Sequence, residues 1–190
     1  MQGRDIGRYE LNWSGMWMQY GHWLSQPREI EIFKRPRVLL REITSDYPYC
    51  LNAMFVRGDY LNNKSILSVL HSDDDAMELK KLLGILNSRL MSIFYKQKAV
   101  KSVRKVFPKV VVKNLREFPY PRAIGKSESK LVVQLADQHI ELQKHIASVK
   151  TNHERTTLQR QIDATDKQID RLVYELYGLT EEEIKIVEGQ

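Results

Sequence analysis

Acidic residues beside lysines could form a metal site, because metal-dependent nucleases can hold their metal with an acid and a Glu-x-Lys unit on neighbouring strands. Glu78-Leu79-Lys80 matches the second half of this pattern, with Asp59 or Asp73 upstream. Glu78, however, falls in the first turn of an expected helix, where a carboxylate favours the positive end of the helix dipole. Glu183-Ile184-Lys185 fits the pattern equally poorly. The sequence therefore disfavours a nuclease site.

Histidine and cysteine offer no alternative chemistry. The five histidines show no metal-ligand spacing, and with one cysteine the chain cannot form a zinc cluster. Cys50, the single cysteine, also excludes an internal disulfide and suits a reducing cytoplasm, where we expect the protein. We expect Cys50 to be a buried structural residue.

Methyl transfer to adenine requires an Asn- or Asp-Pro-Pro-aromatic tetrapeptide, whose polar groups hold the amine of the flipped base. The nearest string, Phe118-Pro119-Tyr120-Pro121, lacks the polar residue and the Pro-Pro pair. No glycine-rich turn for a nucleotide cofactor is present either. The sequence thus predicts a binding module, with no catalytic residue, cofactor or metal site on this chain.

The net charge and its distribution along the chain indicate the kind of partner. The formal net charge is +6, and no Asp or Glu occurs from Leu79 to Arg116, whereas acids predominate after Asp163. A basic face separated from an acidic end is typical of proteins that track phosphates, so we expect double-stranded DNA as the partner. Arg and Lys also reach guanine edges. The candidate DNA-binding residues are Arg35, Arg37, Arg41, Lys96, Lys98, Lys101, Arg104, Lys105, Lys109 and Lys113.

The elements that would position these residues follow from periodicity. Short β-rich stretches bounded by turn residues predict strands at 36–43, 51–56 and 65–70. Leucines recurring every three or four residues after Asp73-Asp74-Asp75 predict one helix over 76–98, capped by an aspartate. The β-branched run 109–113 predicts a further strand.

The last third of the chain is helical in character. Narrow apolar stripes predict two helices that meet at Thr151-Asn152, and the second ends at Tyr177-Gly178. Thr180 and Glu183 form the capping box of a final short helix. Because neither stripe can be buried alone, we expect the two long helices to pair antiparallel.

The expected fold is α+β. A small mixed β-sheet with a packed helix would form a recognition domain at 1–125, and an antiparallel helical hairpin would form 126–190. Most of the aromatic residues Trp13, Trp17, Tyr20 and Trp23 are expected to pack in a core rather than to stack on bases. No apolar run is long enough to span a membrane.

Several strings, in order, resemble one known family. The sequence is similar to the TaqI-like C-terminal specificity domain, the target-recognition domain of bacterial type II adenine-specific DNA methyltransferases and of fused restriction–modification enzymes. The strings are Gly3-Arg4-Asp5-Ile6-Gly7-Arg8-Tyr9, Arg35 to Ile43, Leu82-Leu83-Gly84-Ile85-Leu86-Asn87-Ser88-Arg89-Leu90, Lys113 to Pro121 and Ile169 to Ile184. Arg37 stands where the family more usually has Lys.

The resemblance implies sequence-specific recognition of duplex DNA. Catalysis and S-adenosylmethionine would belong to an N-terminal methyltransferase domain that this chain lacks, so the chain would be a piece of a longer enzyme. The hairpin would act as a scaffold or spacer, with helix-mediated self-association left open. The resemblance also implies that Asn87 and Ser88 turn and cap against the sheet.

Other interpretations remain. A type I-like specificity subunit would bind DNA beside separate catalytic subunits, but it would normally contain two recognition domains. A helical protein-interaction module would dimerise and bind DNA weakly. RNA binding is disfavoured, because the predicted strands carry no aromatic platform.

Overall fold

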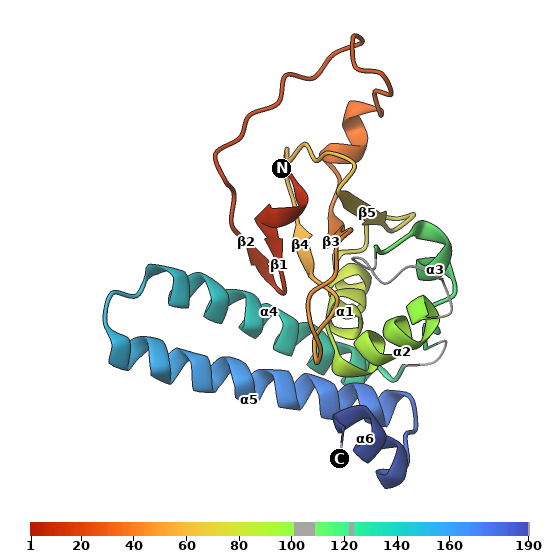
Figure 1. Cartoon of the computed structure of the whole chain (residues 1–190), viewed down its shortest axis with the longest axis vertical. Coiled ribbons are helices and arrows are strands. Elements are labelled where there is room, and N and C mark those ends of the chain that lie inside the picture. Colours follow the sequence, from red (N-terminus) through yellow and green to blue (C-terminus); the bar gives the residue numbers. More distant parts are fainter. Residues whose placement is uncertain (101–108, 122–123, 190) are drawn as a thin grey trace.

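The computed structural model describes residues 1–100, 109–121 and 124–189 (Figure 1). Two antiparallel sheets form: a two-stranded hairpin, and a three-stranded sheet in the order β4-β3-β5. In the larger sheet Leu39 lies opposite Met54 on one side and Ser68 on the other. The strands are β1 (Ile6–Gly7), β2 (Glu10–Leu11), β3 (Arg37–Arg41), β4 (Ala53–Val56) and β5 (Ile66–Leu70).

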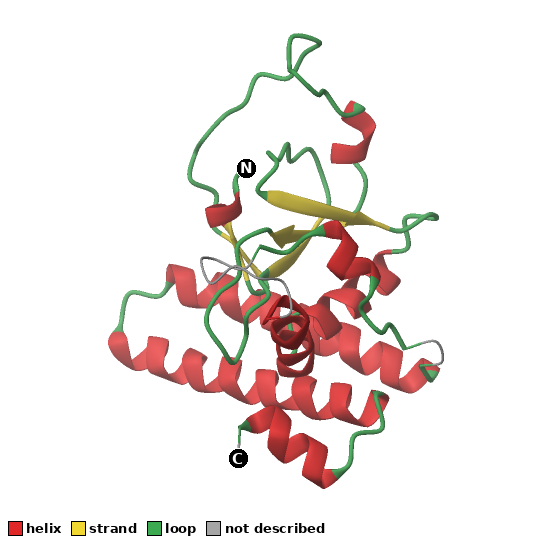
Figure 2. Ribbon diagram, turned by 45° about the vertical axis from the view of Figure 1, so that its right-hand side comes forward, coloured by secondary structure: helices red, strands yellow, loops and turns green. Residues whose placement is uncertain are grey.

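Helices make up most of the remaining structure. The α+β class is confirmed, although the sheet expected to be mixed pairs antiparallel throughout the described residues. In Figure 2 most of the helices lie below the strands, and a long loop extends above the strands. The helices are η1 (Gly3–Asp5), η2 (Ile30–Phe33), α1 (Ala76–Leu86), α2 (Arg89–Val100), α3 (Val112–Arg116), α4 (Lys126–Ser148), α5 (Asn152–Leu176) and α6 (Glu181–Glu188).

The predicted caps are present. The side chain of Asp75 accepts hydrogen bonds from the amides of Met77 and Glu78 at the start of α1. Thr180 and Glu183 form the capping box of α6, and Gly178 adopts a positive φ of 63° after α5. A glycine pays no Cβ penalty in that left-handed conformation, which is why the helix ends there.

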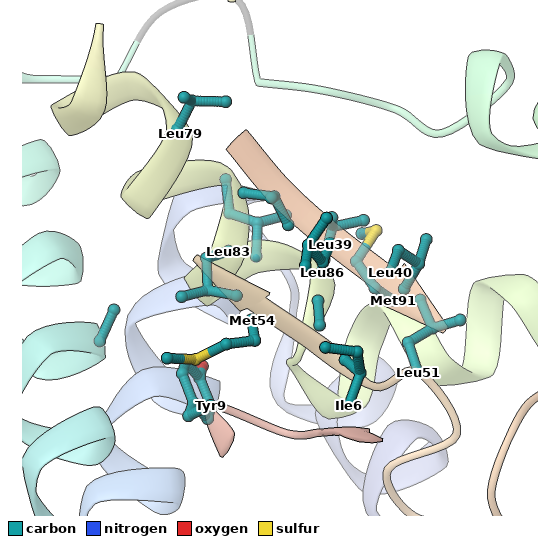
Figure 3. Packing of buried hydrophobic residues seen from close by; sticks show 14 of the residues in the cluster. Ile6, Tyr9, Leu39, Leu40, Leu51, Met54, Leu79, Leu83, Leu86 and Met91 are labelled. Carbon is teal, nitrogen blue, oxygen red and sulfur yellow. The ribbon is translucent and has the colours of Figure 1, made fainter. Parts of the chain in front are cut away.

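One hydrophobic core joins the three-stranded sheet to the helical hairpin formed by α4 and α5. Leu39, Leu40, Leu83 and Met91 pack together with Tyr9 and Met54 (Figure 3), and the same cluster continues into α4 and α5. The expected boundary at 125/126 coincides with the start of α4, yet the residues on either side of it share this core. Burial of each large apolar side chain contributes roughly 1.5–3 kcal/mol.

The antiparallel pairing of α4 and α5 is confirmed, with their connection at Val149–Thr151. Helix α4 also packs closely on α1. The contact is tight at Gly84, where an added Cβ would lie 2.7 Å from a methyl carbon of Val132. The glycine in the Leu-Gly-Ile-Leu-Asn-Ser string is therefore required for two helices to approach each other.

The prediction of one continuous helix over 76–98 is wrong. The chain forms two helices, α1 and α2, which are separated at Asn87 and Ser88. The side-chain oxygen of Asn87 accepts from the Ala53 amide and its nitrogen donates to the Ala53 carbonyl, both at 2.9 Å. Asn87 thus completes the backbone hydrogen bonds of β4 and turns the chain. Capping against the sheet, as implied by the family resemblance, is confirmed.

The strand predicted at 109–113 is also wrong. Only Lys109 pairs with a strand-like partner, Ile43, through an isolated bridge, and residues 112–116 form the short helix α3. Among the described residues no further strand lies beside residue 43 to continue the ladder. The β propensity of Val110 to Val112 is overridden because the tertiary contacts supply no partner strand.

Replacement of Asn87 by Ala should destabilise the fold strongly. The Ala53 amide would lose its partner and the Ala53 carbonyl would keep only the Tyr9 amide, in a site where Asn87 and Ala53 are fully buried. The unsatisfied amide costs roughly 1–3 kcal/mol and the second lost hydrogen bond about 1 kcal/mol. We expect a fall of about 2–4 kcal/mol in the free energy of unfolding, measured with urea. Gln138→Ala, an exposed amide on α4, is the control and should change it little. A loss below about 1 kcal/mol would show that the bonds to Ala53 are dispensable.

Candidate nucleic-acid interface

A mostly buried arginine in the first motif positions the α4–α5 hairpin. Arg8 follows β1, and its guanidinium donates to both carboxylate oxygens of Asp166 on α5, at 2.6 and 3.1 Å. It also donates twice to the carbonyl of Asn87 and stacks on the ring of Tyr49 at 3.7 Å. One side chain therefore joins the β1–β2 hairpin, the α1–α2 break and α5.

Asp166 receives a second partner from α4. Nε2 of His139 lies 2.9 Å from Oδ1 of Asp166, and because a carboxylate only accepts, this nitrogen carries the proton. The His139 ring also stacks on Tyr9 with centroids 4.1 Å apart. Burial opposes ionisation, but the hydrogen bonds from His139 and Arg8 outweigh it and hold the pKa of Asp166 below 3.8.

Asp170, one turn along α5, has the opposite balance. Its carboxylate accepts from the Arg89 amide at 2.8 Å and from the Tyr49 hydroxyl at 2.7 Å. Burial nevertheless dominates and raises the pKa of Asp170 above 3.8. The hydrogen bond to Asp170 satisfies the backbone amide of Arg89, the first residue of α2. Helix α5 therefore fixes where α2 begins and in which direction it runs.

A basic surface lies along α2, α3 and the end of β3. Lys98 on α2 pairs with Glu117 after α3 at 3.0 Å, and the Val110 amide donates to the Glu42 carbonyl at 2.7 Å. Lys96 lies over the ring of Tyr47 at 5.3 Å. The described part of this basic surface comprises Arg41, Lys96, Lys98, Lys109, Lys113 and Arg116, with Glu42 and Glu117 as its acids.

These cations differ in how far they are neutralised. Lys98 and Lys109 form ion pairs with Glu117 and Glu42, at 3.0 and 3.4 Å. Both pairs are at least partly exposed, so their stability contribution is small. Arg41, Lys96, Lys113 and Arg116 form no ion pair with any residue in the described ranges.

Arg37 is not available to DNA, which corrects its place among the candidates. Its side chain is 0% exposed and donates to the carbonyls of Phe33, Arg35 and Tyr60. Burial lowers the pKa of Arg37, which the nearby Asp59 partly offsets. The guanidinium of Arg37 thus binds backbone carbonyls of the chain around η2 and of Tyr60. Arg37 is therefore a structural residue.

Arg35 lies apart from the basic surface. Its guanidinium pairs with Asp74 at 2.7 Å and donates to the carbonyls of His71 and Ser72. It therefore fastens the loop before α1 to the end of η2. The remaining candidates Lys101, Arg104 and Lys105 lie outside the described residues.

Arg116 was missed as a candidate by sequence reasoning, although it closes the acid-free run. It is exposed on α3, beside Lys113. The signal was present in the charge pattern, because Arg116 is the last cation of the run without acids from Leu79 to Arg116. Helix α3 brings residues 113 and 116 onto one face, because residues three apart are neighbours on a helix.

Glu78, the acid of the nuclease-like string Glu78-Leu79-Lys80, serves a structural role. Glu78 lies in the first turn of α1, pairs with Lys81 at 2.6 Å and accepts a hydrogen bond from the Tyr120 hydroxyl at 3.2 Å. Within the described ranges no three His, Cys, Asp or Glu residues come together as a metal site would require. Nor does any helix there have both the length and the apolar character needed to cross a bilayer.

The sequence profile of the TaqI-like C-terminal specificity domain matches residues 1–120, and the chain belongs to this family. Such domains serve sequence recognition in restriction–modification systems and are specificity domains, not catalytic ones. The match includes Arg8, Asn87 and the whole basic surface, and it ends before the hairpin. A search of curated proteins finds no match to the chain.

Two neighbouring carboxylates predict opposite responses to pH. Because the folded pKa of Asp166 is lowered, its carboxylate stabilises the fold above pH 3.8, and this contribution is lost as the pH falls through the folded value. Asp166→Asn should therefore lower the free energy of unfolding by about 3–5 kcal/mol at neutral pH. This loss should shrink in acid.

Asp170→Asn is the matched comparison. The raised pKa of Asp170 gives stability that is present below pH 3.8 and lost as the pH rises through the folded value. The difference between wild type and this variant should thus be larger in acid than at neutral pH. Urea unfolding from about pH 3 to about pH 7 measures both. The same pH trend in the two variants would contradict the assigned network.

Proposed function

We propose that this chain reads duplex DNA as the C-terminal specificity domain of a restriction–modification adenine-N6 DNA methyltransferase. The family match is the observation that carries the proposal. The exposed basic surface on α2 and α3 supports it, since exposed lysines and arginines are the side chains that neutralise phosphates in DNA-binding proteins. Methyl transfer, and with it S-adenosylmethionine, would belong to the methyltransferase part of the enzyme.

The basic surface would set the register on DNA. Phosphate contacts from Arg41, Lys96, Lys113 and Arg116 would hold the duplex without reading its sequence. Lys98 and Lys109 would exchange their carboxylate partners for phosphates. Gln97, exposed between Lys96 and Lys98, has an amide suited to an adenine edge, whereas Asn87 is buried and cannot read a base.

The hairpin would serve as the frame of this surface. Its residues Asp166 and Asp170 hold Arg8 and the start of α2, so the direction of α2 depends on α5. Beyond these contacts α4 and α5 extend away from the sheet (Figure 1). This exposed part of the hairpin is compatible with a type I-like subunit arrangement or with self-association, which remain alternatives.

Duplex binding at several salt concentrations tests the proposal. The logarithm of the affinity should fall linearly with the logarithm of salt concentration, by about 0.9 for each phosphate contacted. Changing Arg41, Lys96, Lys113 and Arg116 together to Ala should make this slope shallower by up to about 3.6. Fluorescence anisotropy of labelled duplex DNA gives both slopes, and we expect affinity on the order of micromolar for the domain alone.

The control removes the same number of cations from the hairpin. Lys150, Arg155, Arg160 and Lys167 are exposed at or near the connection and along α5, and their replacement by Ala lowers the net charge equally. If the two quadruple variants lose the same slope, net charge alone drives binding and the interface is elsewhere. Binding that does not respond to salt would overturn the proposal of phosphate contacts.

A further inference from the structure

A long irregular loop, residues 12–29, carries every tryptophan of the chain, and we name it the aromatic arm. It connects β2 to η2 and passes far outside the sheet (Figure 1). Trp13, Trp17 and Trp23 are 46%, 85% and 68% exposed. The expectation that these residues pack mainly in a core is therefore wrong, and their exposure needs a physical account.

The arm has local order despite its exposure. The rings of Trp13 and Trp17 meet edge to face with centroids 4.9 Å apart, and Nε1 of Trp13 donates to the Met16 carbonyl at 3.2 Å. At its base the Tyr20 ring packs on Phe33 of η2, with centroids 6.3 Å apart. A partner would meet aromatic groups that are already partly arranged, which reduces the entropy lost on binding.

The chemistry of the arm does not suit a phosphate backbone. From Asn12 to Pro27 it contains no Asp, Glu, Lys or Arg, and affinity for DNA depends mainly on cations. Exposed Met16 and Met18 accompany the tryptophans. Trp, Tyr and Met without charge are instead characteristic of the centre of a protein–protein interface.

The arm is also separate from the basic surface. Helix α2 packs against α5 and α6, while the arm lies beyond the end of the sheet that is away from these helices (Figures 1 and 2). DNA held along α2 and α3 would thus leave the arm uncovered. A different partner is required to bury it.

The exposed area is large enough to matter. The three exposed fractions together equal about two complete tryptophan side chains, which is on the order of 300–500 Å². A standard protein interface buries about 800 Å² on each partner. The tryptophans alone would supply roughly half of one side of such an interface.

We infer that the aromatic arm docks on an uncharged apolar surface of the methyltransferase part of the same enzyme. The identity of this partner rests on the proposed function. If the basic surface holds DNA, the contact with the part that modifies DNA falls on another surface. The arm, which has no Asp, Glu, Lys or Arg from Asn12 to Pro27, has the composition for that contact. Burial of Trp17 and Trp23 would provide the anchors.

Fluorine NMR tests this inference directly, because all three tryptophans lie in the arm. The chain labelled with 5-fluorotryptophan should give signals from the arm only. We expect these signals to shift or broaden when the unlabelled methyltransferase part of the enzyme, here called the methyltransferase protein, is added. The double variant Trp17→Ser/Trp23→Ser should weaken this binding at least about tenfold. Ile186→Ser, at a 66% exposed apolar residue on α6, is the control and should bind normally.

Duplex DNA and a second copy of the chain are the competing occupants. DNA binding followed by anisotropy should be unchanged in the double variant, and DNA should leave the fluorine signals in place. Signals that move on adding DNA, or that depend on protein concentration together with dimerisation in sedimentation, would overturn the inference. So would normal affinity of the double variant for the methyltransferase protein.

The two proposals fail in distinguishable ways. Absence of salt-dependent DNA binding contradicts the DNA-reading function, whatever the arm does. The docking inference alone is contradicted if DNA binding depends on salt but the fluorine signals of the arm do not change when the methyltransferase protein is added. The double variant should fold normally, since its side chains are exposed, and urea unfolding verifies this before either result is used.

Discussion

The arrangement of the sheet and the helices in this protein depends on the hydrogen bonds of the Arg8 guanidinium. This guanidinium is mostly buried and contacts Asp166, the Asn87 carbonyl and the Tyr49 ring together. A buried charge without its partner is strongly destabilising, so the sheet and the α4–α5 hairpin are held in one relation. Tyr9 beside it adopts φ of 56° and is fully buried, a backbone conformation that is uncommon for a bulky residue.

This anchor separates two surfaces of different chemistry. Asp170 on α5 holds the amide of Arg89 and so directs α2, which carries the basic surface. At the other end of the sheet the buried Arg37 donates hydrogen bonds to carbonyls near η2, from which the aromatic arm extends, without charged residues from Asn12 to Pro27. Polar networks inside the molecule thus keep a cationic face suited to phosphates apart from an apolar arm suited to protein.

Local patterns in the sequence were sufficient for most elements. The three strands, the α4–α5 hairpin, the cap at Asp75 and the capping box at Thr180 were all predicted, because each depends on residues close together in the chain. The family strings were also visible, although what they do was not. Arg8 and Asp166 lie 158 residues apart, and nothing in the periodicity relates them.

The sequence by itself determined the family, the α+β class, the excess of cations and the absence of catalytic motifs. Only the tertiary structure decided where single side chains go. It turned the helix at Asn87 toward Ala53, buried Arg37, exposed Trp17 and paired Lys98 with Glu117. The reason is physical: propensity and periodicity act over a few residues, whereas burial and ion pairing depend on what distant segments bring to the same place.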